Sequence, residues 1–314
     1  MNIAKKIFHN KPLFILILAS AVMALINPRF ATIGNIVTVL RQTSINAVIA
    51  TGMTFAILTG GIDLSVGSVL GLCGAVAAFM ISSGSNVVLV IITTILLGTF
   101  IGYINGTLVT VGRLQPFIAT LGTVTLLRGI ILVFTQGRPI GVGDTPGSEL
   151  FTEIGRGFIG PLPIPVIIMI IVFLIAYYIL RHTKIGRYIY ATGSNEEATM
   201  YSGIKTEKVK RFVYAVSGMM AALAGILITS RLGSAQPTSG VGYELDAIAA
   251  VVLGGTSMAG GIGTIAGTAI GALIIGLLNN ALNLMQVSSY YQDVAKGIVI
   301  LIAVLLDRKQ KSSR

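Results

Sequence analysis

The sequence has very little charge. Only 11% of its 314 residues are Asp, Glu, Lys or Arg, whereas soluble globular chains carry about 25%. No charged residue occurs between Asp63 and Arg113, or between Asp246 and Asp293. A membrane span needs roughly 20 apolar residues, so each of these stretches can hold two spans and a tight turn. The scarcity of charge therefore excludes an ordinary water-soluble domain.

Cysteine, histidine and tryptophan are equally scarce. Cys73 is the only cysteine, so no intrachain disulfide can form, and it lies in an apolar run where we expect it to be packed. The two histidines, His9 and His182, stand next to polar segments, and tryptophan is absent. These absences argue against an embedded metal site or general base, and hence against an intramembrane enzyme.

What the chain does contain is apolar sequence in long runs. Hydrophobic residues make up 54% of the chain, the mean hydropathy is +0.88 and 38 residues are glycine. The runs do not alternate as the strands of a membrane β-barrel would, and backbone groups in lipid must be satisfied within each segment. We therefore predict an all-α fold, a polytopic transmembrane helical bundle forming one domain over residues 1–314.

The pattern predicts about ten spans. The eighth and tenth are short, so eight or nine crossings with a re-entrant piece are an alternative. A short interfacial helix is expected before the second span, and residues 136–163 form the longest polar connection in the first half. The expected spans are 12–26, 44–58, 66–81, 87–109, 116–134, 164–180, 212–230, 245–254, 262–284 and 294–306.

The basic residues are clustered, and the net charge is +11. Most lie in residues 1–11, 181–211 and 308–314, without the interleaved aromatics of a nucleic-acid surface. Cytoplasmic loops of membrane proteins carry such an excess of Lys and Arg. We therefore expect a multi-pass protein of the inner (cytoplasmic) membrane, in contact with lipid, with both termini in the cytoplasm. Ten spans then put the loops 136–163 and 231–243 outside.

The basic segment before the seventh span contains the signals of a short helix. Ser194 or Asn195 can cap it, Glu196 and Glu197 oppose the positive end of its dipole, and Gly203 can end it. This helix is either a solvated connector or a surface on which a soluble partner docks. The residue pattern alone does not separate the two interpretations.

Several motifs resemble those of a known family. Asn195-Glu196-Glu197-Ala198, followed by Gly203, resembles the coupling loop of ATP-binding cassette (ABC) importer permeases. The stretch 60–68 looks like the corresponding signature of the monosaccharide permeases. The stretches 234–237, 242–257 and 287–292 are similar to the ribose permease family. The likeness extends from about Phe30 to Asp307.

The resemblance implies an ABC importer permease fold and a transport role without covalent chemistry. Two permease chains would pair, as a homodimer. A cytoplasmic ATPase would dock on a coupling helix within residues 181–211, and an extracytoplasmic sugar-binding protein would dock outside. The implied substrate is ribose, with another monosaccharide or a sugar-like molecule as the alternative.

No Walker motif is present, and Gly260-Gly261-Ile262-Gly263 lacks the Lys-Ser/Thr ending of a phosphate-binding loop. The chain is therefore expected to bind no cofactor, and its partner to use the ATP.

A few polar residues lie within the apolar runs and are candidates for the substrate path or its gating. Asp63 has an alternative role as the cap of the next helix. Arg128 has an alternative role in pairing with carbonyls or with an acid inside the bundle. The asparagines have an alternative role in forming hydrogen bonds between helices. An ion-coupled transporter or channel would need buried ionisable groups, and the two charge-free stretches argue against it. The candidates are Asp63, Asn105, Arg128, Asn279 and Asn280.

Overall fold

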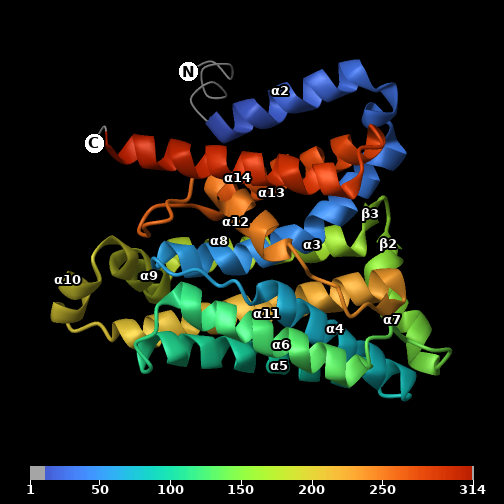
Figure 1. Ribbon diagram of the computed structural model, residues 1–314, viewed down its shortest axis with the longest axis horizontal. Helices are drawn as coiled ribbons and strands as arrows, with labels where there is room; N and C mark the ends of the chain where they lie inside the picture. The colour runs from blue at the N-terminus through green and yellow to red at the C-terminus, as the bar shows by residue number, and fades with distance from the viewer. Residues whose placement is uncertain (1–10, 313–314) are drawn as a thin grey trace.

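The computed structural model describes residues 11–312, most of which are helical, as predicted. The basic start of the chain, up to residue 10, and residues 313–314 lie outside the described residues. Figure 1 shows long helices packed side by side, most of them running along the longest axis of the molecule. Within the described part, five helices are long and apolar enough to cross a membrane. A polytopic helical bundle is thus confirmed, while the number of crossings stays a prediction.

Every predicted span corresponds to a helix, with ends shifted by a few residues in most cases. The main exception is the second span, which is one long helix rather than an interfacial helix and a span. Nothing between residues 33 and 58 breaks a helix, and the Thr32 hydroxyl accepts from the Asn35 amide at 3.4 Å to cap its start. The helices are α2 (Lys11–Ile26), η1 (Pro28–Ala31), α3 (Ile33–Leu58), α4 (Val66–Ser82), α5 (Val87–Thr110), α6 (Pro116–Thr135), α8 (Ile164–His182), α11 (Thr206–Leu232), α12 (Tyr243–Leu253), α13 (Ile265–Leu284) and α14 (Ser289–Ser312).

The polar connections contain more structure than the sequence indicated. The connection 136–163 includes the helix α7 (Pro146–Arg156) and a hairpin of β2 (Phe158–Ile159) and β3 (Leu162–Pro163). Its first strand, β1 (Ile140–Gly141), pairs antiparallel with β4 (Ser234–Ala235). Because β4 belongs to the connection after α11, the two loops expected on the same side of the membrane meet at one end of the bundle.

Helix α11 is the most buried of the five apolar helices, and glycine lets it approach α5. Gly98, Gly102 and Gly106 recur every fourth residue and so share one face of α5. A side-chain carbon added at Gly102 would overlap the carbonyl oxygen of Tyr214 on α11. Small residues at this spacing allow close backbone contact between membrane helices. Helix α5 is thus held closely against the buried helix α11, while its opposite face stays exposed.

The outward faces of several helices are apolar. Leu96 on α5 is 62% exposed, Val133 on α6 is 80% exposed and Leu174 on α8 is 63% exposed. A soluble monomer rarely exposes so much contiguous apolar surface. These faces fit the hydrocarbon interior of a membrane, as the low charge content predicts.

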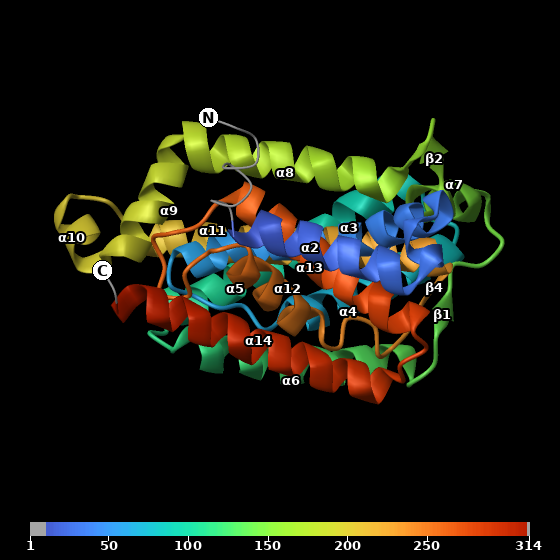
Figure 2. The same cartoon turned by 90° about the horizontal axis from the view of Figure 1, so that it is seen from above.

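The two ends of the bundle differ. Helices α9 (Lys184–Ser194) and α10 (Glu196–Tyr201) project from one end, and α7 with the short strand pairs covers the other (Figures 1 and 2). Helix α2 begins nearer the α9–α10 end, and α14 runs back toward it. In Figure 1 the chain leaves α3 at this same end and returns inward as an extended segment before α4 begins.

A second interruption follows α12. This helix has 11 residues, and at 1.5 Å per residue it spans only about 17 Å, short of the roughly 30 Å of a bilayer interior. Residues 254–264 then run without helix to α13. Two interrupted segments, 59–65 and 254–264, are therefore built into the fold, and the eighth predicted span is not a complete crossing as a helix.

Candidate functional site

Helix α10 forms as the residue pattern predicts. The Asn195 side chain accepts a hydrogen bond from the Ala198 amide at 2.9 Å, which caps the helix. Gly203 has a φ of +82°, the left-handed conformation that glycine adopts readily, and ends it. Glu196 and Glu197 lie in the first turn and are exposed. The predicted local structure is confirmed, although its coupling role is a separate question.

The outer surface of α10 is open. Met200 is 53% exposed and Tyr201 is 78% exposed at the tip of the molecule. Lys210 on α11 donates to a carboxylate oxygen of Glu196 at 2.5 Å, which ties α10 to the start of α11. Two large exposed side chains on a short anchored helix form a surface suited to a protein partner.

Helix α9 lies directly against the two interrupted segments. The amide of Gly261 donates to the carbonyl oxygen of Leu58 at 2.9 Å, which joins the second interruption to the end of α3. A side-chain carbon at Gly193 would overlap that same oxygen, so only glycine allows α9 to approach this closely. Helix α9 is therefore in close contact both with the end of α3, where the first interruption begins, and with the second interruption.

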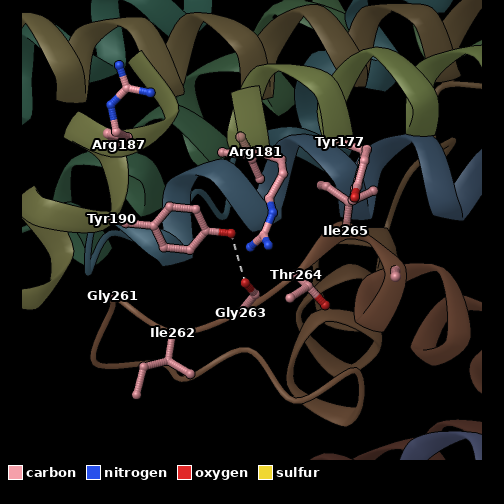
Figure 3. Close-up of a pocket in the computed structure, with 11 residues that line it drawn as sticks. Tyr177, Arg181, Arg187, Tyr190, Gly261, Ile262, Gly263, Thr264 and Ile265 are labelled. Atoms are coloured by element: carbon pink, nitrogen blue, oxygen red, sulfur yellow. Dashed lines mark hydrogen bonds between the residues drawn. The ribbon is translucent and has the colours of Figure 1, made fainter. Parts of the chain in front are cut away.

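Tyr190 adds a second link from α9. Its hydroxyl donates to the carbonyl oxygen of Gly263 at 2.9 Å, as the dashed line in Figure 3 shows. Burial raises the pKa of Tyr190, and the nearby positive charge of Arg181 opposes this shift only in part. The phenol therefore keeps its proton at neutral pH and stays a hydrogen-bond donor.

Asp63 and Asn105 belong to one buried chain of hydrogen bonds. An Asp63 carboxylate oxygen accepts from the Ser65 amide at 3.0 Å and from its hydroxyl at 2.6 Å. The Asn105 amide group donates to the Ser65 hydroxyl at 2.8 Å and accepts from Thr123 at 2.6 Å. Asp63, Ser65 and Asn105 are fully buried. This chain fixes the start of α4 against α5 and α6. Asp63 bonds the Ser65 amide as the capping alternative expects, although the N-cap residue of α4 is Ser65 itself.

Arg128 lies half-buried on α6. Its guanidinium donates to the carbonyl oxygen of Ser239 at 2.8 Å, just before α12, and it interacts electrostatically with Glu244. Carbonyl pairing inside the bundle is the alternative role expected for this arginine. The contact also links α6 to the entry of the short helix α12.

The asparagines of α13 bond to neighbouring helices. The Asn279 amide donates to Asp246 on α12 at 3.4 Å, and Lys296 on α14 contacts the same carboxylate oxygen at 3.4 Å. Asn280 exchanges hydrogen bonds of 2.9 and 3.0 Å with Asn35 on α3. The interhelical alternative therefore describes both of these side chains.

The candidate residues thus fall into separate groups. Asp63 and Asn105 share one network, while Arg128 and Asn279 both contact α12 or the segment leading to it. Asn280 lies apart, against α3. Sequence reasoning missed Lys296, although it is the one lysine inside a span of the second half, and a lone charge there needs a partner.

Comparison with known proteins gives a consistent result. The family model described as the permease component of branched-chain amino acid transport systems matches residues 35–304. The chain is 57% identical to the ribose import permease protein RbsC of Haemophilus influenzae, over 98% of this chain and 95% of that protein. It is 55% identical to RbsC of Bacillus subtilis (96% and 92% covered) and 53% identical to RbsC of Escherichia coli K12 (97% and 95% covered).

No solved structure matches this chain. The family model matches most of the chain, and the chain matches almost the whole length of each of the three relatives. The shared description of the family is a transport-system permease, which fits an apolar helical bundle rather than an enzyme. The chain therefore belongs to the family of permease components typified by branched-chain amino acid transport systems.

Proposed function

We propose that this chain is the membrane-spanning permease subunit of an ATP-driven ABC importer for ribose. The observation that carries the proposal is the identity of 53–57% to ribose import permeases over nearly the whole length of both chains. The geometry of the α9–α10 end gives a physical route by which a separate ATPase could act on the bundle.

The α9–α10 end is proposed to face the cytoplasm. It carries most of the cations of residues 181–211, together with Arg113 between α5 and α6. The positive-inside rule places such an end in the cytoplasm. The ends of α2 and α14 that lie nearer this end would then put both chain termini in the cytoplasm.

Coupling is proposed to run from α10 through α9 to the two interruptions. The exposed side chains Met200 and Tyr201 provide the contact with the ATPase. Gly193 packs against the Leu58 carbonyl oxygen, which accepts the hydrogen bond from the Gly261 amide. Interrupted helices are common at the binding sites of transporters, where their ends and unwound backbone contact the transported species. A push on α10 would then shift the segments that precede α4 and α13.

The sugar path is proposed to run beside α12. Asp246 on this short helix, with Arg128, Asn279 and Lys296 on neighbouring helices, offers both donors and acceptors. Sugar hydroxyls need such groups, whereas the fully buried Asp63 and Asn105 are committed to each other through Ser65. The network at Asp63 is proposed to hold the first interruption in shape.

The proposed assembly contains a second copy of this chain, two cytoplasmic ATPase domains and an extracytoplasmic ribose-binding protein. The end formed by α7 and the β1–β4 pair would face the binding protein. Another monosaccharide is the alternative substrate, and competition by that sugar in the uptake assay would identify it.

The coupling step is tested by charge reversal at Glu196. In proteoliposomes with the ATPase and the binding protein, Glu196→Lys is expected to lower ribose-stimulated ATP hydrolysis at least tenfold while membrane insertion is unchanged. The double variant Glu196→Lys with Lys210→Glu restores the local ion pair. Loss of coupling in both variants supports contact of Glu196 with the ATPase. Wild-type coupling in the single variant would overturn the proposal.

A further inference from the structure

A cavity of about 700 Å³ opens at the corner between α8 and α9. Its walls come from the end of α8, from Tyr190 on α9 and from residues 261–266, which lead into α13 and form its first two residues. Figure 3 shows the Arg181 guanidinium directed into the space between Tyr190 and Thr264. Arg187 lines the rim, and its guanidinium is turned away from the loop.

The cavity carries positive charge without a counter-ion. Within residues 11–312, Arg181 has no ion pair or hydrogen bond to another protein group, and no Asp or Glu lines the cavity. Tyr190 stays neutral because burial raises the pKa of its phenol, and its hydroxyl donates to the Gly263 carbonyl oxygen. A permanently charged guanidinium with five donors and no acid nearby fits an anion.

The start of α13 adds donors on the opposite wall. Thr264 accepts from the Gly267 amide at 3.0 Å and caps this helix of 20 residues. The amides of Ile265 and Ala266, in the first turn, have no partner within the helix. They lie at the positive end of the α13 dipole, and Ile265 and Ala266 line the same cavity as Arg181. A phosphate group between them would meet donors from both sides.

The surroundings of the cavity are those of a membrane boundary. Upstream of Arg181, the outer face of α8 is apolar and open, with Ile175 at 55% and Tyr178 at 62% exposed. Tyr178 stacks on His182 with ring centroids 5.5 Å apart, at the polar end of this apolar helix. Aromatic and cationic side chains gather at helix ends where lipid headgroups lie.

We propose that this cavity binds the phosphate of an anionic phospholipid, held between Arg181 and the first amides of α13, with the acyl chains along the outer face of α8. A soluble anion lacks the chains that the apolar face of α8 would cover. A carboxylate of a protein partner would approach from the aqueous side, where Arg187 points, rather than along the lipid-facing side of α8.

The test is native mass spectrometry of the purified full-length chain in neutral detergent, titrated with phosphatidylglycerol or phosphatidylcholine. Arg181→Gln is expected to lower the apparent affinity for phosphatidylglycerol about fivefold, since one basic side chain near an anionic lipid contributes roughly that factor. Arg181→Lys keeps the charge and is expected to stay within about twofold of wild type. Arg113→Gln, at the same end but between α5 and α6, is the matched control and is expected to change nothing.

Three outcomes would overturn the proposal. The first is an unchanged phosphatidylglycerol affinity in a folded Arg181→Gln protein. The second is displacement of the lipid by millimolar inorganic phosphate, which would assign the cavity to a free anion. The third is loss of ATPase binding in Arg181→Gln with lipid binding intact, which would assign it to a protein partner. The prediction is independent of the transported sugar, so failure of ribose uptake would not affect it.

Discussion

At the residue scale, buried polar side chains hold this bundle together at specific points. Asn105 is the clearest case, because both ends of its amide group are used and it is fully buried. In membrane proteins a hydrogen bond between helices is worth about 0.6 kcal/mol on average and up to about 1.7 kcal/mol. The contribution of each group is therefore modest, and its main effect is to fix the position of the chain.

Replacing Asn105 by leucine is expected to destabilise the protein by roughly 1–3 kcal/mol, because two interhelical hydrogen bonds are lost at once. The measurement is reversible unfolding in mixed detergent micelles. Thr107→Val is the control on the same helix, since the Thr107 hydroxyl bonds only to the Tyr103 carbonyl oxygen of its own helix. Equal stability of the two variants would show that the Asp63 network contributes nothing.

Sequence reasoning at this scale singled out several polar residues inside the apolar runs but not their partners. The composition of the apolar runs made Asp63, Asn105 and Asn279 conspicuous, because polar groups in lipid must be satisfied. The pairing of Asn105 with Ser65 depends on how α4 and α5 are placed in space, which no local pattern contains. Lys296 was overlooked for the same reason, since its acid lies 50 residues earlier on α12.

At the element scale, close helix contact depends on glycine. Gly102 faces the backbone of α11, whereas Gly122 on α6 has open space beside it. The two residues therefore form a matched pair with the same chemistry and opposite surroundings.

Gly102→Ala is expected to destabilise the protein by about 1–3 kcal/mol, because the added methyl group overlaps the Tyr214 carbonyl and separates α5 from α11. Gly122→Ala is expected to be neutral or to stabilise by up to about 1 kcal/mol, as helix propensity predicts. Thermal unfolding of both variants in detergent is the measurement. A destabilised Gly122→Ala protein with an unaffected Gly102→Ala protein would contradict the packing described.

At Gly193 we expect a substitution to affect transport rather than stability. A methyl group there would push α9 away from the Leu58 carbonyl oxygen. Gly193→Ala is expected to retain ATPase binding but to lower ribose uptake per ATP hydrolysed severalfold, because the contact with the two interruptions is altered. Pull-down of the ATPase and uptake assays separate the two effects. Normal uptake in this variant would exclude α9 as the link.

The helices themselves were largely predictable, because apolar runs of about 20 residues separated by Gly, Pro and charge can form little else. Helix α7 escaped prediction, since its short amphipathic pattern lies in a loop with several prolines, and only its packing buries Phe151. From the sequence, this span is expected to begin only at residue 44, because Asn35 and Arg41 give the first turns of α3 a polar composition. In the structure Asn35 bonds to Asn280, and Arg41 lies over the Phe158 ring at 4.7 Å.

At the scale of the whole molecule, the central question is which end faces the cytoplasm. Cys73 is buried and is the only cysteine, so a background with Cys73→Ala carries no other thiol. Tyr201 at the tip of α10 and Ile159 at the other end are 78% and 63% exposed. Single cysteines at these two positions would report the orientation.

In that background, an impermeant maleimide is expected to label Ile159→Cys in intact spheroplasts and to leave Tyr201→Cys unlabelled. Tyr201→Cys should react only in inverted membranes, because the positive-inside rule predicts a cytoplasmic α9–α10 end. Labelling of Tyr201→Cys from outside would reverse the orientation and remove the proposed docking surface for the ATPase.

In the proposed mechanism, a separate ATPase drives ribose through this bundle by acting on α10. The most direct measurement is radiolabelled ribose uptake in proteoliposomes that contain this chain, the ATPase and the binding protein. Ribose is expected to accumulate above its external concentration only when both ATP and the ATPase are present. Equal ribose entry without the ATPase, or in the absence of ATP, would contradict it.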